Sequence, residues 1–257
     1  MPATVSALAT TPVKGLRVVA VARIEIGPAG AAGDRRFYLV DERGWMVNGK
    51  RIGALSTVVA AYEAGAGTLS LTFPGGDVVA GEVELGEPIA TRFFSRPASA
   101  RPVLGAWSDA LSEHVGEPVR IVESVGRAGV DRGRAGAVSL ISRASLDGLA
   151  QVAGSDTIDA RRFRMLVEID GVAAHEEDGW LGERVRVGGA LVRFGGHVGR
   201  CAITTRDPES GTVDLPTLDL LRSYRSGLET TEPLAFGVYG EVLEPGTVAL
   251  GDAVVLA

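Results

Sequence analysis

The strongest constraint on the fold is a succession of short apolar segments that alternate with polar residues and are separated by turn residues. Such segments cover residues 3–9, 17–26, 35–44 and 68–85, and they return from residue 184 to the end of the sequence. Alternation with a period of two is typical of a strand buried on one face. Strands spaced about ten residues apart favour a small barrel or sandwich. The 35 glycines among 257 residues, roughly twice the ~7% average, fit an architecture with many tight turns.

Three turn signals punctuate the N-terminal part of the chain. Pro12 and Gly15 mark a turn in the segment TPVKGL. The pair Asn48-Gly49 is a hairpin signal, because both residues tolerate positive φ. Residues 74–76, Pro-Gly-Gly, separate two alternating strands within 68–85. The N-terminal part is therefore predicted to consist of hairpins and short strands.

The middle of the sequence changes to a helical period. Apolar residues recur at helical spacing in 107–116, 142–154 and 217–227, which predicts three short helices. The segment 126–138 is rich in Gly and Arg and is predicted to be an exposed loop. The segment 159–171 is predicted to lead into a strand.

The ends of two of these helices carry capping signals. Ser108 or Asp109 is expected to cap the first helix, and Gly116 is expected to end it. Ser142 is expected to cap the second helix, and Gly154 is expected to end it. The buried stripe of this second helix is predicted to consist of three residues: Leu146, Leu149 and Val152.

Together these patterns predict a mainly β (α+β) protein built from two units. The first is a β-barrel-like module over residues 1–95, and the second is a mainly β domain with a few helices over residues 96–257. The segment SRPASARP at 95–102 is the only linker-like stretch between them. A length of 257 residues also permits one large domain.

Charge and composition exclude several classes of function. Lys+Arg 26 against Asp+Glu 32 leaves a net charge of −6, which argues against a non-specific nucleic-acid binder. No apolar run reaches the roughly 18 residues that span a bilayer, and the first residues do not resemble a signal peptide. The single cysteine, Cys201, excludes an intramolecular disulfide and a zinc site made of several thiolates. A reducing, cytoplasmic location is the expectation.

The common catalytic motifs are missing from the sequence. It contains no dinucleotide-binding glycine motif after a strand, no P-loop, no HExxH and no Gly-x-Ser-x-Gly. The three histidines, His114, His175 and His197, lie far apart in the sequence and are interpreted as surface or hydrogen-bonded side chains. The acidic run 176–178 is interpreted as a solvated loop, with a metal-binding carboxylate cluster as the alternative.

Cys201 is the clearest chemical candidate. It lies in the segment GGHVGRCAITTRDPESG, between a glycine-rich turn and a predicted strand rich in threonine. The neighbouring Arg200 favours the thiolate, which is the form of cysteine that attacks electrophiles or binds a metal. The alternative is an inert buried thiol, which is a frequent role of a lone cysteine.

The residues around Cys201 resemble those of MOSC-domain proteins of the amidoxime-reducing type, in which an Arg-Cys pair precedes a Thr-Thr-x-Asp-Pro-x-x-Gly turn. That pattern stands here at residues 200–211. Further segments resemble the same family in the correct order over nearly the whole chain. They are TPVKGL (11–16) and GDRRFYLVDERG (33–44) of the N-terminal β-barrel module, SLISRASLDGL (139–149), LPTLDLLRSYR (215–225) and FGVYGEVLEPGTVALGDAVVL (236–256).

The resemblance implies a molybdenum cofactor, a pterin whose dithiolene sulfurs hold the metal and which carries a phosphate. Cys201 would complete the thiolate ligands of the metal and act as the catalytic residue. Soft donors such as a thiolate suit this metal, and the phosphate needs cations and backbone N–H groups. Cofactor contacts are expected from Lys14, Gly15, Arg36, Arg164, Arg200, Cys201 and Tyr239. The alternatives are surface ion pairs for the arginines and a core position for the tyrosine.

The reaction that the resemblance implies is the two-electron reduction of N-hydroxylated or N-oxygenated small molecules. Electrons would come from a separate donor protein, such as a ferredoxin, a cytochrome or a flavin reductase, and no nucleic-acid or membrane partner is expected. One alternative is a non-redox cofactor carrier or sulfur-transfer protein with a persulfide on Cys201. Another is a binding module without a cofactor.

Three positions depart from the family pattern. Val198 replaces a second cysteine that often lies three residues before the ligand. Met165-Leu166 replaces the Pro-Asn of a Phe-Arg-Pro-Asn motif, and Arg134-Ala135-Gly136 replaces a cluster of acids and hydroxyls. If Leu166 lies beside the pterin, a hydrogen bond from an amide is lost there. If the strand is placed one residue differently, Leu166 is a core residue.

Overall fold

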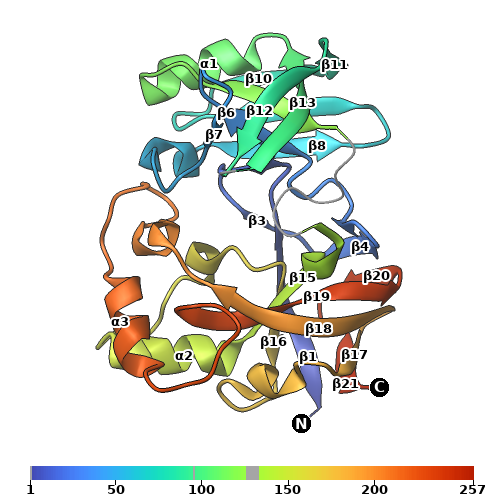
Figure 1. Ribbon diagram of the computed structural model, residues 1–257, viewed down its shortest axis with the longest axis vertical. Helices are drawn as coiled ribbons and strands as arrows, with labels where there is room; N and C mark the ends of the chain where they lie inside the picture. The colour runs from blue at the N-terminus through green and yellow to red at the C-terminus, as the bar shows by residue number, and fades with distance from the viewer. Residues whose placement is uncertain (1, 95, 126–132) are drawn as a thin grey trace.

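The computed structural model describes residues 2–94, 96–125 and 133–257. Figure 1 shows two β-rich units stacked along the long axis of the molecule, with both chain termini at the end of the lower unit. The mainly β class and the barrel architecture predicted from the sequence are confirmed. None of the described helices is long and apolar enough to cross a membrane.

The lower unit is a closed barrel. Its sheet runs in the order β16-β15-β19-β18-β17-β21-β1, and an additional antiparallel pairing of β16 with β1 closes the ring. The strand bounds are β1 Ala3–Thr10, β15 Val138–Ser142, β16 Val167–Asp170, β17 Arg184–Val187, β18 Ala190–Gly199, β19 Ala235–Glu244 and β21 Ala253–Leu256. Closure removes the open sheet edges that would otherwise leave backbone groups unpaired.

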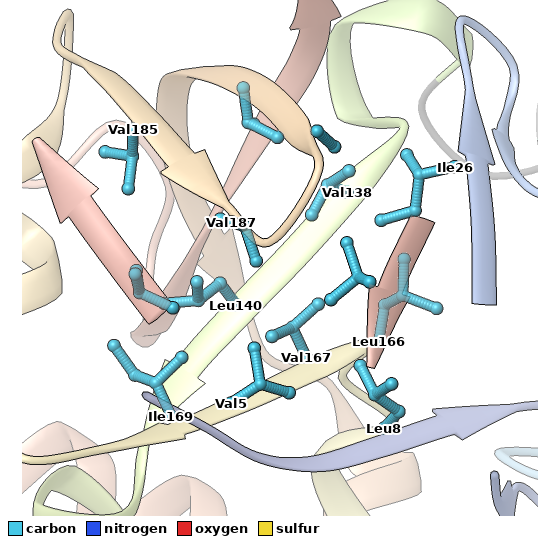
Figure 2. Close-up of a cluster of buried hydrophobic side chains, with 14 of the residues drawn as sticks. Val5, Leu8, Ile26, Val138, Leu140, Leu166, Val167, Ile169, Val185 and Val187 are labelled. Carbon is cyan, nitrogen blue, oxygen red and sulfur yellow. The ribbon is translucent and has the colours of Figure 1, made fainter. Parts of the chain in front are cut away.

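Aliphatic side chains fill the inside of this barrel. Figure 2 shows Val5 from β1, Leu140 from β15, and Leu166, Val167 and Ile169 from β16 and the residue before it, gathered in one cluster. Each of these residues is at most 2% exposed, as expected where the inward-facing residues of the strands form the core. The two short strands β4 (Arg23–Gly27) and β20 (Gly246–Ala249) pair beside the barrel.

The upper unit consists of a seven-stranded sheet and a three-stranded sheet packed over a second core. The larger sheet has the path β11-β13-β14-β6-β2, with β12 and β7 attached, and the smaller has the order β10-β9-β8. The strand bounds are β2 Val13–Lys14, β6 Phe37–Val40, β7 Met46–Val47, β8 Val59–Glu63, β9 Thr68–Thr72, β10 Val78–Glu82, β11 Glu84–Leu85, β12 Ile89–Phe93, β13 Arg96–Leu104 and β14 Arg120–Ser124. The core between the sheets includes Leu16, Phe37, Leu69, Leu111 and Ile121.

The three predicted helices are present. They are α1 (Trp107–Val115), α2 (Arg143–Val152) and α3 (Thr217–Tyr224). Ser142 caps α2 as predicted, because its side chain accepts a hydrogen bond from the Ser145 N–H. Gly116 ends α1 with a left-handed conformation, also as predicted, although neither proposed N-cap side chain acts as one. Val152 is 43% exposed, so its assignment to the buried stripe of α2 was wrong.

Four local predictions need correction. Residues 17–26 form two short strands, β3 (Val19–Ala20) and β4, instead of one. Asn48-Gly49 does not join a hairpin; it turns the chain toward the 3-10 helix η1 (Gly53–Thr57). The predicted linker 95–102 is wrong from residue 96 onward, since β13 pairs there with β12 and β14 in the middle of a sheet; residue 95 lies outside the described residues. The segment after Cys201 is the 3-10 helix η5 (Ala202–Thr205) and not a strand.

Each unit is built from parts of the chain that are not continuous in the sequence. β1 and β4 lie near the N-terminus but pair with strands of the barrel unit. α1 and β14 follow residue 95 but pack in the upper unit. A domain boundary at residues 95/96 stays a prediction. The predicted loop 126–138 falls mostly outside the described residues; its end, Gly133–Gly136, forms the 3-10 helix η2.

Candidate functional site

A cavity of about 770 Å³ lies where the two units meet. It is lined from the upper unit by residues such as Lys14, Asn48 and Phe93, and from the barrel unit by residues such as Ser139 and Cys201. Cavities of this size accommodate small-molecule ligands and cofactors, commonly at a junction between structural units. Both units must therefore be in place for this site to exist.

Six of the seven residues predicted to bind the cofactor line this cavity, although they come from distant parts of the sequence. They are Lys14, Gly15, Arg164, Arg200, Cys201 and Tyr239. The seventh, Arg36, lies elsewhere.

Cys201 is held at the wall of the cavity while remaining exposed. It directly follows Arg200 at the end of β18 and has extended backbone with φ −135°. Its carbonyl oxygen accepts hydrogen bonds from the Thr204 N–H and the Thr204 Oγ1, each at 3.1 Å. The buried Thr204 hydroxyl is in turn 2.7 Å from Thr217 Oγ1 at the start of α3. The thiol is thus accessible, while hydrogen bonds from Thr204 to the Cys201 carbonyl hold its backbone in place.

Lys14 ends the short strand β2, which pairs with β6, and Gly15 follows it in a turn. Gly15 has φ +105°, a conformation that favours glycine. A Cβ atom at this position would lie 3.3 Å from the Asn48 Cα, so the 48–49 turn packs closely on Gly15. The Lys14 Nζ lies 5.8 Å from the ring centroids of both Phe93 and Phe94.

The structure brings Arg35 to the cavity instead of Arg36. Arg35 lines the cavity, forms an ion pair with Asp34, and donates through Nη2 to the Arg164 carbonyl at 2.7 Å. Arg36 points away, with its Nε 2.5 Å from Glu123 Oε1 and its guanidinium 4.8 Å from the Tyr62 ring centroid. Both arginines precede β6, and Arg35 lies in a turn with φ +47°, so the sequence alone does not reveal which of the two adjacent arginines faces inward.

Arg164 and Arg200 line the cavity, and their guanidinium groups donate hydrogen bonds to backbone carbonyls. Arg164 has φ +54° and donates through Nη2 to the Leu16 carbonyl at 2.7 Å, across the junction of the units. Arg200 donates through Nη1 to the Phe163 carbonyl at 2.8 Å and through Nε to the Phe236 carbonyl at 2.9 Å. Both side chains therefore contribute to the architecture of the cavity wall.

The cavity favours an anionic ligand. Among the described lining residues the cations outnumber the single carboxylate, Asp34, which is already paired with Arg35. The cationic lining residues are Lys14, Arg35, Lys50, Arg96, Arg164 and Arg200. A concave wall with one dominant sign of charge concentrates ligands of the opposite sign.

Leu166 borders this cavity but belongs to the barrel core. It is 2% exposed and packs with Val5, Leu8 and Val167, and Figure 2 shows its side chain among these residues. Its backbone N–H donates to Ser139 Oγ at 3.0 Å. The core position, one of the two alternatives for this residue, fits the structure.

A buried polar network lies behind the barrel wall, where sequence analysis expected a solvated acidic loop. Glu177 is fully buried, and its Oε1 accepts hydrogen bonds from the Ser145 hydroxyl at 2.7 Å and the Ser142 N–H at 3.1 Å. His175 Nε2 lies 2.8 Å from the Tyr224 hydroxyl. Burial of the His175 ring, with the nearby Arg225 cation, lowers its pKa to about 4.

All three histidines have hydrogen-bonding partners. His197 Nδ1 accepts from the Thr231 N–H at 3.2 Å, and His114 Nε2 lies 2.8 Å from Thr57 Oγ1. Among the residues that the structure describes, no three His, Cys, Asp or Glu side chains are grouped as a metal ion would require.

Comparison with known protein families is consistent with this architecture. The MOSC domain family matches residues 127–255, and the MOSC N-terminal β-barrel domain family matches residues 2–118. The chain belongs to the MOSC family. These two matches cover the upper unit and the barrel unit of this MOSC protein almost completely.

Curated relatives are named mitochondrial amidoxime-reducing components. The MOSC protein is 35% identical over 99 residues to component 2 from Homo sapiens, which covers 36% of this chain and 29% of that protein. It is 26% identical over 286 residues to component 1 from Xenopus laevis, covering 97% of this chain and 81% of that protein. A YUAD protein from Bacillus subtilis, seen in a crystal structure, aligns with a TM-score of 0.46 and 13% identity over 99% of this chain and 94% of that one. The chain thus spans less than a third of the human relative in the matched region.

The residues of this MOSC protein fit a molybdenum cofactor, the group that the family implies. Cys201 places an exposed sulfur atom at the cavity wall, and sulfur is a soft donor that suits a dithiolene-bound metal. The cations that line the cavity suit a phosphate. Gly15 has the positive φ that lets the backbone approach closely to its surroundings. The donor set and the charge of the cavity are thus consistent with such a ligand.

Proposed function

We propose that this MOSC protein binds a molybdenum cofactor in the cavity and reduces N-hydroxylated or N-oxygenated small molecules. The observation that carries the proposal is the convergence of the single cysteine with a cationic cavity at the junction of the two units. Cys201 would hold the metal through its thiolate, and the bound cofactor would supply the two-electron redox chemistry. The reduction consumes two electrons and two protons and converts an N–OH group into N–H and water.

The surrounding residues would bind and orient the cofactor. Lys14 would provide a charge for the phosphate beside the Gly15 turn, and Arg35 would add a second cation at the cavity lining. Tyr239, which also lines the cavity, would contact the cofactor. Arg164 and Arg200 would shape the wall through their bonds to backbone carbonyls. Arg36, which pairs with Glu123 outside the cavity, is not proposed as a cofactor contact.

Electrons would arrive from a separate donor protein, such as a ferredoxin, a cytochrome or a flavin reductase. A thiol exposed in a cavity is also compatible with the alternative, in which Cys201 carries a persulfide or the protein only carries the cofactor. The cytoplasmic location stays a prediction from the single cysteine, while the curated relatives bear mitochondrial names.

The proposal is tested on protein produced in a host that synthesises the cofactor. The expected result is molybdenum bound close to one per chain and reduction of an amidoxime by the protein with a chemical reductant. Molybdenum without any such reduction would favour the carrier or sulfur-transfer alternative. Protein that never acquires molybdenum, although other molybdoenzymes of the same host do, would contradict the proposal.

Cys201→Ser is the decisive variant. The hydroxyl is a harder and far less acidic donor than the thiol, so it is a poor replacement for a soft ligand. We expect loss of bound molybdenum and of amidoxime reduction, with the melting temperature of the wild type, because the exposed side chain contributes little to packing. Full turnover in the serine variant would refute the role of Cys201 as metal ligand.

A further inference from the structure

The bonds around Arg200 indicate a role in placing the neighbouring thiol. Its Nη1 donates to the Phe163 carbonyl at 2.8 Å, and its Nε donates to the Phe236 carbonyl at 2.9 Å. Its Nη2 lies 2.9 Å from Met165 Sδ, and its Cζ lies 5.3 Å from the centroid of the Phe163 ring. One guanidinium thereby contacts two separate segments of the barrel unit.

Both of these segments contribute to the cavity lining, one through Phe163 and the other, β19, through Tyr239. Phe163 ends the 3-10 helix η3 (Ala160–Phe163) and is 2% exposed, while Phe236 in β19 is fully buried. Arg164 follows directly and reaches across to the Leu16 carbonyl of the upper unit. The forked guanidinium of Arg200 supplies donors to the Phe163 and Phe236 carbonyls, and a buried carbonyl without a donor is costly. Through these bonds Arg200 connects the Cys201 segment to this wall.

We infer that Arg200 is a positioning residue that fixes the Cys201 thiol relative to the wall containing Phe163, Arg164 and Met165. The expected effect on metal binding rests on the proposed function, whereas the positioning of Cys201 by Arg200 does not. What Arg200 contributes is the planar fork of donors, which reaches two acceptors at once, and not only its positive charge. A lysine keeps the charge but cannot reproduce the fork.

The test compares R200K and R200M with matched controls, R193K and R193M. Arg193 lies on β18, the strand that Arg200 follows, but its side chain is exposed and pairs with Glu241. Iodoacetamide alkylation of the apoprotein across pH is followed by mass, which reports on one site because Cys201 is the only cysteine. The midpoint pH reports on the charge near the thiol, and the plateau rate at high pH reports on the accessibility of the ionised sulfur.

We expect both Arg200 variants to raise the plateau rate about two-fold or more, because loss of the fork lets the segment open locally. The midpoint of R200K should stay at the wild-type value. In cofactor-loaded protein, both variants should retain molybdenum about 10- to 100-fold less tightly, as when partners that orient a metal ligand are removed. The Arg193 variants should match the wild type in every measurement.

Each outcome decides the inference. Wild-type plateau rates in both Arg200 variants, or full rescue of plateau rate and molybdenum retention by lysine, would overturn it. If R200M does not fold, R200K with a wild-type melting temperature carries the comparison, and unfolding of both variants would show that Arg200 serves overall stability instead. If the wild type binds no molybdenum, the proposed function fails, while the alkylation plateau still tests the positioning of Cys201.

Discussion

Three non-glycine residues with positive φ border the cavity: Arg35, Phe94 and Arg164, with φ of 47°, 54° and 54°. Such conformations cost on the order of 1–3 kcal/mol each and persist only where surrounding contacts hold them. Two hydrogen bonds hold Arg164 in this conformation. Its side chain donates to the Leu16 carbonyl, and its backbone carbonyl accepts from the Arg35 side chain. The cavity wall is therefore stabilised by interactions that cross between the two units.

Lys14 and Lys50 test how the cavity would bind a phosphate. Both lysines line the cavity, but Lys14 is half-buried and Lys50 is exposed to water. A charge-assisted hydrogen bond is stronger where water is excluded, so Lys14→Ala should weaken cofactor retention more than Lys50→Ala. A loss of about 1.5–3 kcal/mol corresponds to roughly ten- to a hundred-fold in affinity. Equal pterin content in the two purified variants would contradict this prediction.

Leu166→Asn should destabilise the protein without improving cofactor binding. The substitution places an amide among Val5, Leu8 and Val167 and removes apolar packing, which costs about 2–5 kcal/mol for comparable core changes. Urea unfolding measures the loss, and metal analysis measures the cofactor. Val213→Asn is the matched control, because Val213 is 65% exposed. A higher molybdenum content at unchanged stability would instead place Leu166 against the pterin.

At the scale of elements, the buried polar network fastens η4 (Glu176–Trp180) to α2 and α3. Glu177 in η4 bonds the N-terminus of α2 through the Ser142 N–H and the Ser145 hydroxyl, and His175 contacts Tyr224 at the end of α3. Burial raises the pKa of Glu177 and lowers that of His175. The stability of this corner should therefore depend on pH.

The free energy of unfolding should fall as the pH decreases from 6.5 toward about 4. In this window the unfolded chain protonates His175, with its ordinary pKa of 6.5, while the folded chain does so only near its lowered pKa of about 4. Excess proton binding by the unfolded state reduces stability. With screening by solvent, the slope from this residue should be at most about 1 kcal/mol per pH unit.

His175→Asn isolates this contribution, since asparagine tolerates the positive φ of 63° at that position. Urea unfolding at several pH values should show a shallower dependence in this variant than in the wild type. Glu177 acts in the opposite direction, because the folded state takes up its proton first, but it is present in both proteins. His114→Asn is the control, and an unchanged slope in the His175 variant would refute the assignment.

At the scale of the whole molecule, the site depends on the docking of two units that are interleaved in sequence. The turn after Cys201 docks on the upper unit, where Arg17 Nη1 lies 2.6 Å from Glu209 Oε2 and donates through Nη2 to the Glu209 carbonyl at 2.9 Å. Gly53 and Gly211 meet backbone to backbone at the same junction. The thiol segment is thus connected to the unit that carries Lys14.

Gly53→Ala should disturb this docking. A Cβ at residue 53 would lie 2.2 Å from the Gly211 carbonyl oxygen and 2.6 Å from Arg206 Nη1, so the 206–211 turn must move. We expect a loss of about 1–3 kcal/mol of stability, seen by urea unfolding, together with weaker molybdenum retention. Gly65→Ala is the control because nothing lies within 4 Å of its Cβ. Wild-type stability in the Gly53 variant would contradict the docking contact.

The sequence by itself determined the features that depend on local pattern. Periodic apolar residues, turn glycines and the Ser142 cap predicted most strands, three helices and the mainly β class, because propensity and alternation act within a few residues. The ordered motifs around Cys201 and near both ends of the chain identified the MOSC family, which the family matches confirm. The candidate thiol was identified because it is the only cysteine.

Only the tertiary structure decided which side each residue faces and which distant segments meet. The inward position of Arg35 in place of Arg36, the burial of Glu177 and the core position of Leu166 all depend on how one strand or turn packs on another. The pairing of β1 and β4 with the barrel joins residues more than a hundred positions apart. Such contacts follow from closing a barrel and excluding water from two cores, which no local pattern in the sequence records.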